Sequence, residues 1–165
     1  MKAIFKADHY LNGIDCAYAA SRSAGRSVTK FYDLVLAPTG LKANQFITLK
    51  AIHDAREIAQ NEFARKHLIA LETLSRNFGG LRRKGLITAR TGEKREHIYT
   101  LTDKGLAVLN ETLPYWKRAQ TRLRTMLGSD GWSGLLSVCN RVSAASESAE
   151  QVLRSEQAAR TKPHQ

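Results

Sequence analysis

The segment from residue 71 to residue 101 restricts the possible folds of this chain more than any other part of the sequence. Residues 71–84 carry an apolar stripe with helical spacing, formed by Leu71, Leu74, Phe78 and Leu81. Gly85 follows as a natural C-terminal stop. Two segments rich in β-branched and aromatic residues come next, residues 86–90 and 96–101, separated by a short glycine-containing turn. The pattern predicts an amphipathic helix followed by a β-hairpin.

Positive charge is concentrated in the same segment. The whole chain has 26 Lys and Arg residues against 15 Asp and Glu residues, a formal net charge of +11. Positions 76–95 contain seven basic residues and one acidic residue, Glu93, which gives a local net charge of +6. The seven are Arg76, Arg82, Arg83, Lys84, Arg90, Lys94 and Arg95. This concentration favours a polyanionic partner, with nucleic acid ahead of an acidic membrane surface.

Helical spacing of apolar residues also predicts helices before this segment. A long first helix is expected over residues 14–35, and a turn containing proline and glycine at residues 37–40 ends it. A second helix is expected over residues 42–55 and a short third over residues 61–66. The chain is therefore mainly α-helical, with one small β-hairpin.

Two further helices are expected after the hairpin. Asp103 is expected to cap a fifth helix that runs to about residue 127, with a kink or a restart at Pro114. After a glycine-containing turn at residues 128–131, a sixth helix from Ser133 is expected to bury Leu135, Leu136, Val138 and Val142. Residues 161–165 are expected to fray.

The order of these elements predicts a DNA-binding fold. A short helix, a turn, a second helix with a basic end and a hairpin form a helix-turn-helix with an added wing. Such a second helix fits the major groove, and a basic hairpin tip reaches phosphate or the minor groove. Arg76 suits a guanine edge and Asn77 an adenine edge. The full set of expected DNA contacts is Thr73, Ser75, Arg76, Asn77, Arg82, Lys94 and Arg95.

Several stretches together resemble the MarR family of winged-helix transcription factors, over roughly residues 16–128. They are Tyr32-Asp33 through Leu41 with Gln45-Phe46, Thr73-Leu74-Ser75-Arg76-Asn77, Lys84-Gly85-Leu86-Ile87, Glu93-Lys94-Arg95, Leu101-Thr102-Asp103-Lys104-Gly105 and Leu113-Pro114-Tyr115-Trp116. The resemblance implies a homodimeric repressor whose two recognition helices read a pseudopalindromic operator. It also implies a winged domain at residues 41–102 and a helical dimerisation region formed by residues 1–40 and 103–160.

In many members of that family a small aromatic or phenolic acid weakens DNA binding. The side chains expected to bind its carboxylate are Arg22, Arg26 and His53. The expected apolar walls of the pocket are Phe31, Tyr32, Phe46 and Trp116. The alternative for each of these residues is ordinary packing in the core or an interface.

Two other functions stay open. Gly79 and Gly80 cost the recognition helix about 1 kcal/mol each relative to alanine, which predicts a loosened or distorted helix and favours a weakly specific architectural DNA-binding protein. Cys16 allows a thiol-based redox regulator, although its tyrosine spacing differs from the peroxide-sensing branch, so that an inert interface thiol is the preferred interpretation. Cys139 is expected in the core.

Other classes of protein have no support in the sequence. No catalytic or nucleotide-binding motif and no metal-ligand spacing of His or Cys is present, so we expect neither enzyme activity nor a cofactor. No apolar run approaches the ~18 residues of a membrane span, and the N-terminus lacks the apolar core of a signal peptide. We therefore expect a cytoplasmic protein.

Overall fold

The computed structural model describes residues 16–66, 71–92 and 96–160. The chain divides into two compact units, Met1–Ala119 and Gln120–Gln165. The expected fraying of residues 161–165 and the wing residues Lys94 and Arg95 lie outside the described residues.

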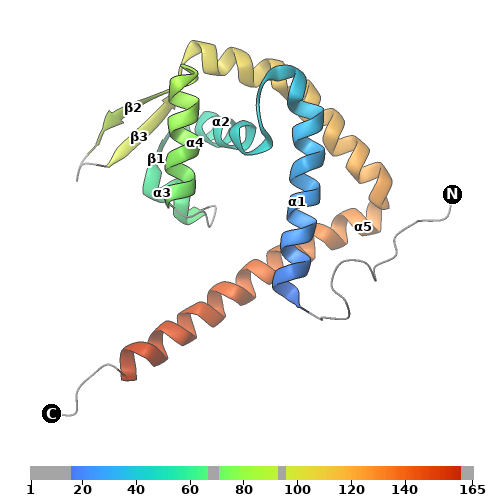
Figure 1. Cartoon of the computed structure of the whole chain (residues 1–165), viewed down its shortest axis with the longest axis vertical. Coiled ribbons are helices and arrows are strands. Elements are labelled where there is room, and N and C mark those ends of the chain that lie inside the picture. Colours follow the sequence, from blue (N-terminus) through green and yellow to red (C-terminus); the bar gives the residue numbers. More distant parts are fainter. Residues whose placement is uncertain (1–15, 67–70, 93–95, 161–165) are drawn as a thin grey trace. The chain divides into compact units, whose positions relative to one another are not determined.

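The first unit is mainly helical, with one small antiparallel sheet, and this confirms the predicted fold class. Its elements are α1 (Ala17–Leu36), the short 3₁₀ helix η2 (Ala37–Thr39), α2 (Ala43–Ala55), β1 (Glu57–Ala59), α3 (Gln60–Lys66), α4 (Leu71–Arg83), β2 (Ile87–Thr91), β3 (His97–Leu101) and the start of α5 at Asp103. Figure 1 shows the strands gathered beside α3 and α4. The predicted helix boundaries agree with these to within a few residues.

The sheet has three strands, whereas the sequence predicted a two-stranded hairpin. Its order is β1-β3-β2, with Glu57 opposite Thr100 and Ala89 opposite Tyr99. The additional strand β1 has only three residues, of which Ile58 alone is buried. A segment this short shows no alternation of apolar and polar residues, so periodicity could not predict it.

Helix α4 ends as the sequence predicted, at Gly85. The φ of Gly85 is 70°, and its amide donates to the carbonyl of Arg82 while the amide of Leu86 donates to that of Leu81. These two bonds form a Schellman cap. The expected distortion at Gly79 and Gly80 is wrong, because both lie inside the continuous helix Leu71–Arg83.

The core of the first unit lies between α2, α3, α4 and the sheet. Its largest fully buried side chains include Phe46, Phe63 and Phe78, and Phe78 stacks on Tyr99 with ring centroids 4.0 Å apart. Three of the four leucine and phenylalanine residues of the predicted α4 stripe are buried, but Leu71 is 45% exposed because it begins the helix. Burial of these side chains fixes α4 on α2 and β3.

Helix α5 (Asp103–Arg160) begins and continues differently from the prediction. Thr102 caps it rather than Asp103, because the Oγ1 of Thr102 accepts a 3.0 Å hydrogen bond from the amide of Gly105. The backbone stays helical through Pro114, whose fixed φ already suits a helix. The flanking residues Leu113 and Trp116 pack against the core and hold this turn in place.

The interruption of α5 lies at Gly128, within the predicted turn, where φ is 72° and ψ is 172°. Glycine adopts this conformation without a steric penalty, so one residue makes the break and the helix resumes at once. The predicted end of the fifth helix near residue 127 and the sixth helix after it are therefore confirmed, but that sixth helix starts directly after Gly128 and not at Ser133.

The second unit leaves its apolar residues uncovered within the chain. Leu136, Val138 and Val142 were expected to be buried, yet they are 49%, 54% and 42% exposed. Cys139 is exposed as well and is not a core residue. The reason is that this helical segment has no neighbouring element within its own unit. Among the described residues, no helix combines the length and the apolar character that crossing a membrane requires.

Candidate nucleic-acid interface

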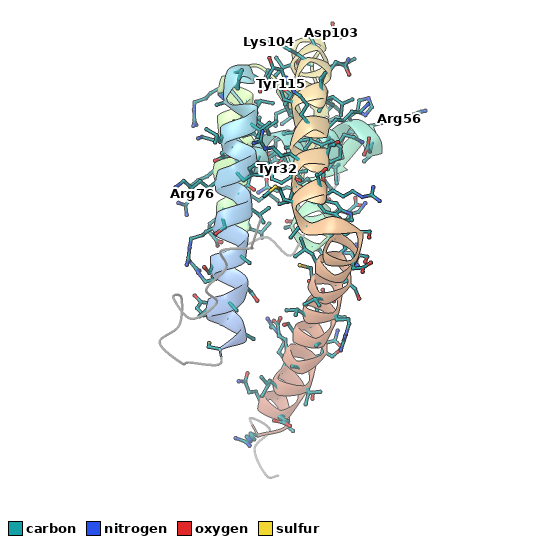
Figure 2. The ribbon with its side chains drawn as sticks, turned by 90° about the vertical axis from the view of Figure 1, so that its right-hand side faces the viewer. Tyr32, Arg56, Arg76, Asp103, Lys104 and Tyr115 are labelled. Carbon is teal, nitrogen blue, oxygen red and sulfur yellow. The ribbon has the colours of Figure 1, made fainter. Side chains whose placement is uncertain are left out.

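Helix α4 exposes the face that the sequence predicted to read DNA. Thr73, Ser75 and Arg76 are all exposed, on the opposite side from the buried Leu74 and Phe78. Within the part of the chain that the structure describes, the guanidinium of Arg76 has no ion pair or hydrogen bond, and Figure 2 shows it extending away from the helices. Its five N–H donors are therefore available to an external acceptor.

Ser75 is held in place by a chain of hydrogen bonds from the sheet. The phenol of Tyr99 donates to Oε1 of Gln60 at 3.2 Å, and Nε2 of Gln60 donates to Oγ of Ser75 at 2.7 Å. Because Ser75 accepts this bond, its hydroxyl hydrogen stays free to donate outward. The chain joins β3, α3 and α4, so it also fixes the orientation of α4.

Asn77 lies on a different side of α4 from Arg76. Its Nδ2 donates to Oγ1 of Thr48 at 2.6 Å and lies 3.5 Å from the carbonyl oxygen of Asn44, and the residue is half-buried. An adenine contact uses both the donor and the acceptor of an asparagine amide. The structure therefore places Asn77 in the packing of α4 against α2, apart from the exposed face.

The basic cluster separates into structural and free side chains. Nζ of Lys84 donates to the carbonyl of Gly40 at 2.8 Å and lies 3.3 Å from Oε1 of Gln45, so it ties the end of α4 to the start of α2. Arg90 bonds both carboxylate oxygens of Glu57 at 3.0 Å and braces β2 to β1 across β3. Neither charge is freely available to a phosphate.

Arg82 and Arg83 remain as exposed cations at the end of α4. Burial raises the pKa of the Tyr99 phenol, while the positive charge of Arg82 acts in the opposite direction. The exposed face of α4 thus carries three cations that the sequence singled out, Arg76, Arg82 and Arg83.

A groove of about 470 Å³ runs between α2 and α4, and we call it the α2–α4 groove. Its lining includes Thr73, Asn77, Lys42 and Asn44. Lys42 and Asn44 were not among the residues predicted from the sequence to contact DNA. Their position in the first turn of α2, off the buried side of Phe46, was the available signal.

The structure does not gather the expected effector residues into one pocket. Phe46 is fully buried and stacks on Trp116 with centroids 5.8 Å apart, as a part of the core. Phe31 and Tyr32 form an edge-to-face pair with each other, and burial raises the pKa of the Tyr32 phenol. His53 is exposed, pairs with Asp54 and lines a separate hollow of about 200 Å³.

Arg22 and Arg26 lie elsewhere, on α1. They line an open groove of about 530 Å³, which we call the α1 groove; the other lining residues are Gly25, Thr29, Lys30, Asp33 and Lys42. Aromatic side chains are absent from this lining. An aromatic acid would find cations here but no aromatic side chain to stack on.

The described residues form no site suited to cysteine or metal chemistry. Cys16 is half-buried at the start of α1, and its thiol forms no disulfide or hydrogen bond with the side chains of the described residues. Residues 16–66, 71–92 and 96–160 contain no group of three His, Cys, Asp or Glu side chains that could hold a metal ion.

Comparison with solved structures finds a consistent set of DNA-binding regulators. The transcriptional regulator MosR of M. tuberculosis is 30% identical in sequence, with a TM-score of 0.71 over 81% of this chain and 97% of MosR. A mutant of MarR from E. coli in complex with operator DNA is 21% identical, with a TM-score of 0.67 over 74% of this chain and 90% of MarR. BpsR of Bordetella bronchiseptica, whose DNA binding is regulated by 6-hydroxynicotinic acid, is 18% identical, with a TM-score of 0.69 over 79% of this chain and 95% of BpsR. No family model and no curated protein matches the chain.

Proposed function

Because the chain belongs to the MarR family of winged-helix transcriptional regulators, we propose that it is a homodimeric, sequence-specific repressor that a small aromatic or phenolic acid releases from DNA. In this proposal α4 is the recognition helix, and the protein acts in the cytoplasm without enzymatic activity. The partner is a pseudopalindromic operator whose two half-sites match the two recognition helices of the dimer.

The observation that carries the proposal is the free guanidinium of Arg76 on the exposed face of α4. Hydrogen bonds join Ser75 to Gln60 of α3 and Asn77 to Thr48 of α2, and a bond from Lys84 to the carbonyl of Gly40 fixes the C-terminal end of the helix, so its exposed side chains have a fixed orientation. Bidentate bonding of arginine to guanine is the commonest specific contact in the major groove. Thr73 and Ser75 supply hydroxyls beside it, and Arg82 supplies charge for phosphate.

Replacement of Arg76 tests this assignment. For Arg76→Ala we expect the binding free energy for the preferred duplex to weaken by about 1 to 3 kcal/mol. We also expect the preference for one base pair of each half-site to relax. Arg82→Ala is the matched control, because it removes the same charge from the same helix. We expect it to weaken all duplexes equally. Uniform weakening by Arg76→Ala as well would reduce Arg76 to a phosphate contact.

Uncovered apolar residues support the homodimer. In the second unit, Val152 and Leu153 near the end of α5 are 55% and 57% exposed, in addition to the exposed Leu136, Val138 and Val142. Apolar side chains left exposed along one helix often mark a surface that associates with another chain. We expect sedimentation at twice the chain mass. Leu136→Glu should shift the equilibrium to monomer, whereas Ser137→Glu on the adjacent position serves as the control; a monomeric wild type would contradict the proposal.

The regulation of BpsR by 6-hydroxynicotinic acid supports an aromatic acid as the releasing ligand. The residues expected to form its pocket lie apart in this chain, so the proposal concerns the class of ligand and not its site. We expect at least one aromatic acid, such as a hydroxybenzoate or a hydroxynicotinate, to weaken binding to the preferred duplex. Calorimetry with the DNA-free protein should show the same acid binding, as linkage requires. An acid that weakened DNA binding without itself binding to the protein would contradict the mechanism.

A further inference from the structure

Helix α1 carries a row of cations that the proposed function does not use. Arg22, Arg26 and Lys30 are all exposed and are spaced by four residues, so they lie about 6 Å apart along one face of the helix. Arg22 lies over the ring of Tyr18, 5.5 Å from its centroid. Within the described ranges none of the three forms an ion pair.

The one carboxylate among the lining residues of the α1 groove is already engaged. Oδ1 of Asp33 accepts a 2.7 Å hydrogen bond from the amide of Ala43, at the start of α2, and Oδ2 lies 3.6 Å from Nζ of Lys42. The lining thus holds four cations, those of Arg22, Arg26, Lys30 and Lys42, against one carboxylate. An uncompensated positive surface of this kind attracts a polyanion.

The α1 groove and the α2–α4 groove share one lining residue, Lys42. The α2–α4 groove is also lined by Thr73 of α4. The side chain of Lys42 is 71% exposed, so its charge is accessible to a ligand that lies along both grooves. A phosphate backbone that leaves α4 across the start of α2 would meet the cations of α1 next.

We propose that Arg22, Arg26, Lys30 and Lys42 form a second phosphate-binding surface, which extends the DNA contact from α4 onto α1. The ligand is the sugar-phosphate backbone of duplex DNA. The inference rests on the proposed DNA-binding function, and it adds binding energy that does not depend on sequence. The lack of an aromatic wall separates this surface from a site for an aromatic acid.

The test is the salt dependence of DNA binding by the full chain. The variant replaces Arg22, Arg26 and Lys30 by glutamine, and the control replaces Arg56, Lys117 and Arg118 by glutamine, which removes the same charge. These control residues line neither groove. In Figure 2, Arg56 also extends to the side opposite Arg76. Binding to the preferred duplex and to a scrambled duplex is measured from about 0.05 to 0.2 M salt.

We expect the slope of log K against log salt concentration to become less steep by about 2 to 3 per protomer in the α1 variant, because each neutralised phosphate contributes about 0.9. The ratio of affinities for the two duplexes should stay at its wild-type value. The control should change the slope by less than about 1. Unchanged circular dichroism and urea midpoints would show that both variants fold.

A wild-type slope in the α1 variant overturns the inference, and so does an equal change in the variant and the control. Calorimetry with inorganic phosphate separates the two sources of the anion. If phosphate binds the wild type and not the variant while the slope stays unchanged, the row serves small anions and the proposal is wrong. Failure of the proposed function has a different signature, because the wild type itself would then show no preference between the duplexes.

Discussion

The amide of Asn77 donates a 2.6 Å hydrogen bond to the buried hydroxyl of Thr48, and this bond joins α4 to α2. Thr48 in turn donates to the carbonyl of Asn44 at 2.8 Å. Both hydrogen-bonding functions of the buried hydroxyl are therefore satisfied. The bond fixes the face that α4 turns toward α2, and with it the face that remains exposed.

Asn77→Ala should destabilise the protein without changing its base preference. It removes the donor to a buried acceptor, so we expect the free energy of unfolding to fall by about 1 kcal/mol. Urea unfolding measures this loss, and selection of preferred duplexes measures the base preference. A stable Asn77→Ala protein that accepted any base at one position would show that Asn77 leaves Thr48 and reads DNA.

Two glycines should respond to alanine in opposite directions. A methyl group at Gly105 would overlap the carbonyl of Leu86, where α5 meets the end of α4, so Gly105→Ala should cost more than about 2 kcal/mol. At Gly79 the nearest atom to such a methyl group is in the Arg83 side chain at 3.5 Å, so Gly79→Ala should stabilise α4 by about 1 kcal/mol. Thermal unfolding of the two variants compares them directly. Equal losses would contradict the packing described at Gly105.

Arg56→Gly should stabilise the chain. Arg56 joins α2 to β1 with a φ of 65° and a ψ of −49°, a conformation that L side chains rarely adopt. Its side chain is exposed, so little packing is lost on replacement. Relief of the strain should outweigh the added entropy of the unfolded chain, for a net gain of up to about 1 kcal/mol. Arg56→Ala keeps the strain and is the control; a gain of the same size in that variant would refute this explanation.

Stability should fall above pH 10. Burial raises the pKa of Tyr99 above its ordinary value, so above pH 10 the unfolded chain loses this proton more readily than the folded chain. The contribution of the neutral phenol is complete below pH 10 and disappears as the pH rises through the folded pKa. Ionisation also removes the hydrogen that Tyr99 donates to Gln60. The free energy of unfolding, measured with urea at pH 8 and above pH 10, should fall less between the two pH values in Tyr99→Phe than in the wild type. An equal fall in both proteins would contradict the role given to the Tyr99 phenol.

The sequence predicted most elements of the fold because their signals are local. The apolar stripe of α4, the glycine at its end and the β-branched strands were each sufficient to place an element. Strand β1 was missed because three residues carry no period. The kink expected at Pro114 was wrong, because the fixed φ of proline suits a helix and Trp116 packs against the core, whereas the break predicted at Gly128 is present.

The candidate site was predicted less completely. Exposure of Thr73, Ser75 and Arg76 follows from the helical period, which the sequence contains. The roles of Lys84 and Arg90 depend on partners 44 and 33 residues away, at Gly40 and Glu57, which no local pattern reveals. The effector pocket was predicted from residue types alone, and tertiary packing divides those residues among the core, the α1 groove and the hollow beside His53.

Sequence preference is the central claim, and selection from a pool of random duplexes tests it most directly. The bound duplexes are sequenced, and the preferred and a scrambled duplex are then titrated with salt. The account predicts a two-fold-symmetric motif and a preference of about 10³ or more over the scrambled duplex at physiological salt. No motif, with equal and steeply salt-dependent affinity for both duplexes, would contradict it and indicate an architectural protein that binds through charge alone.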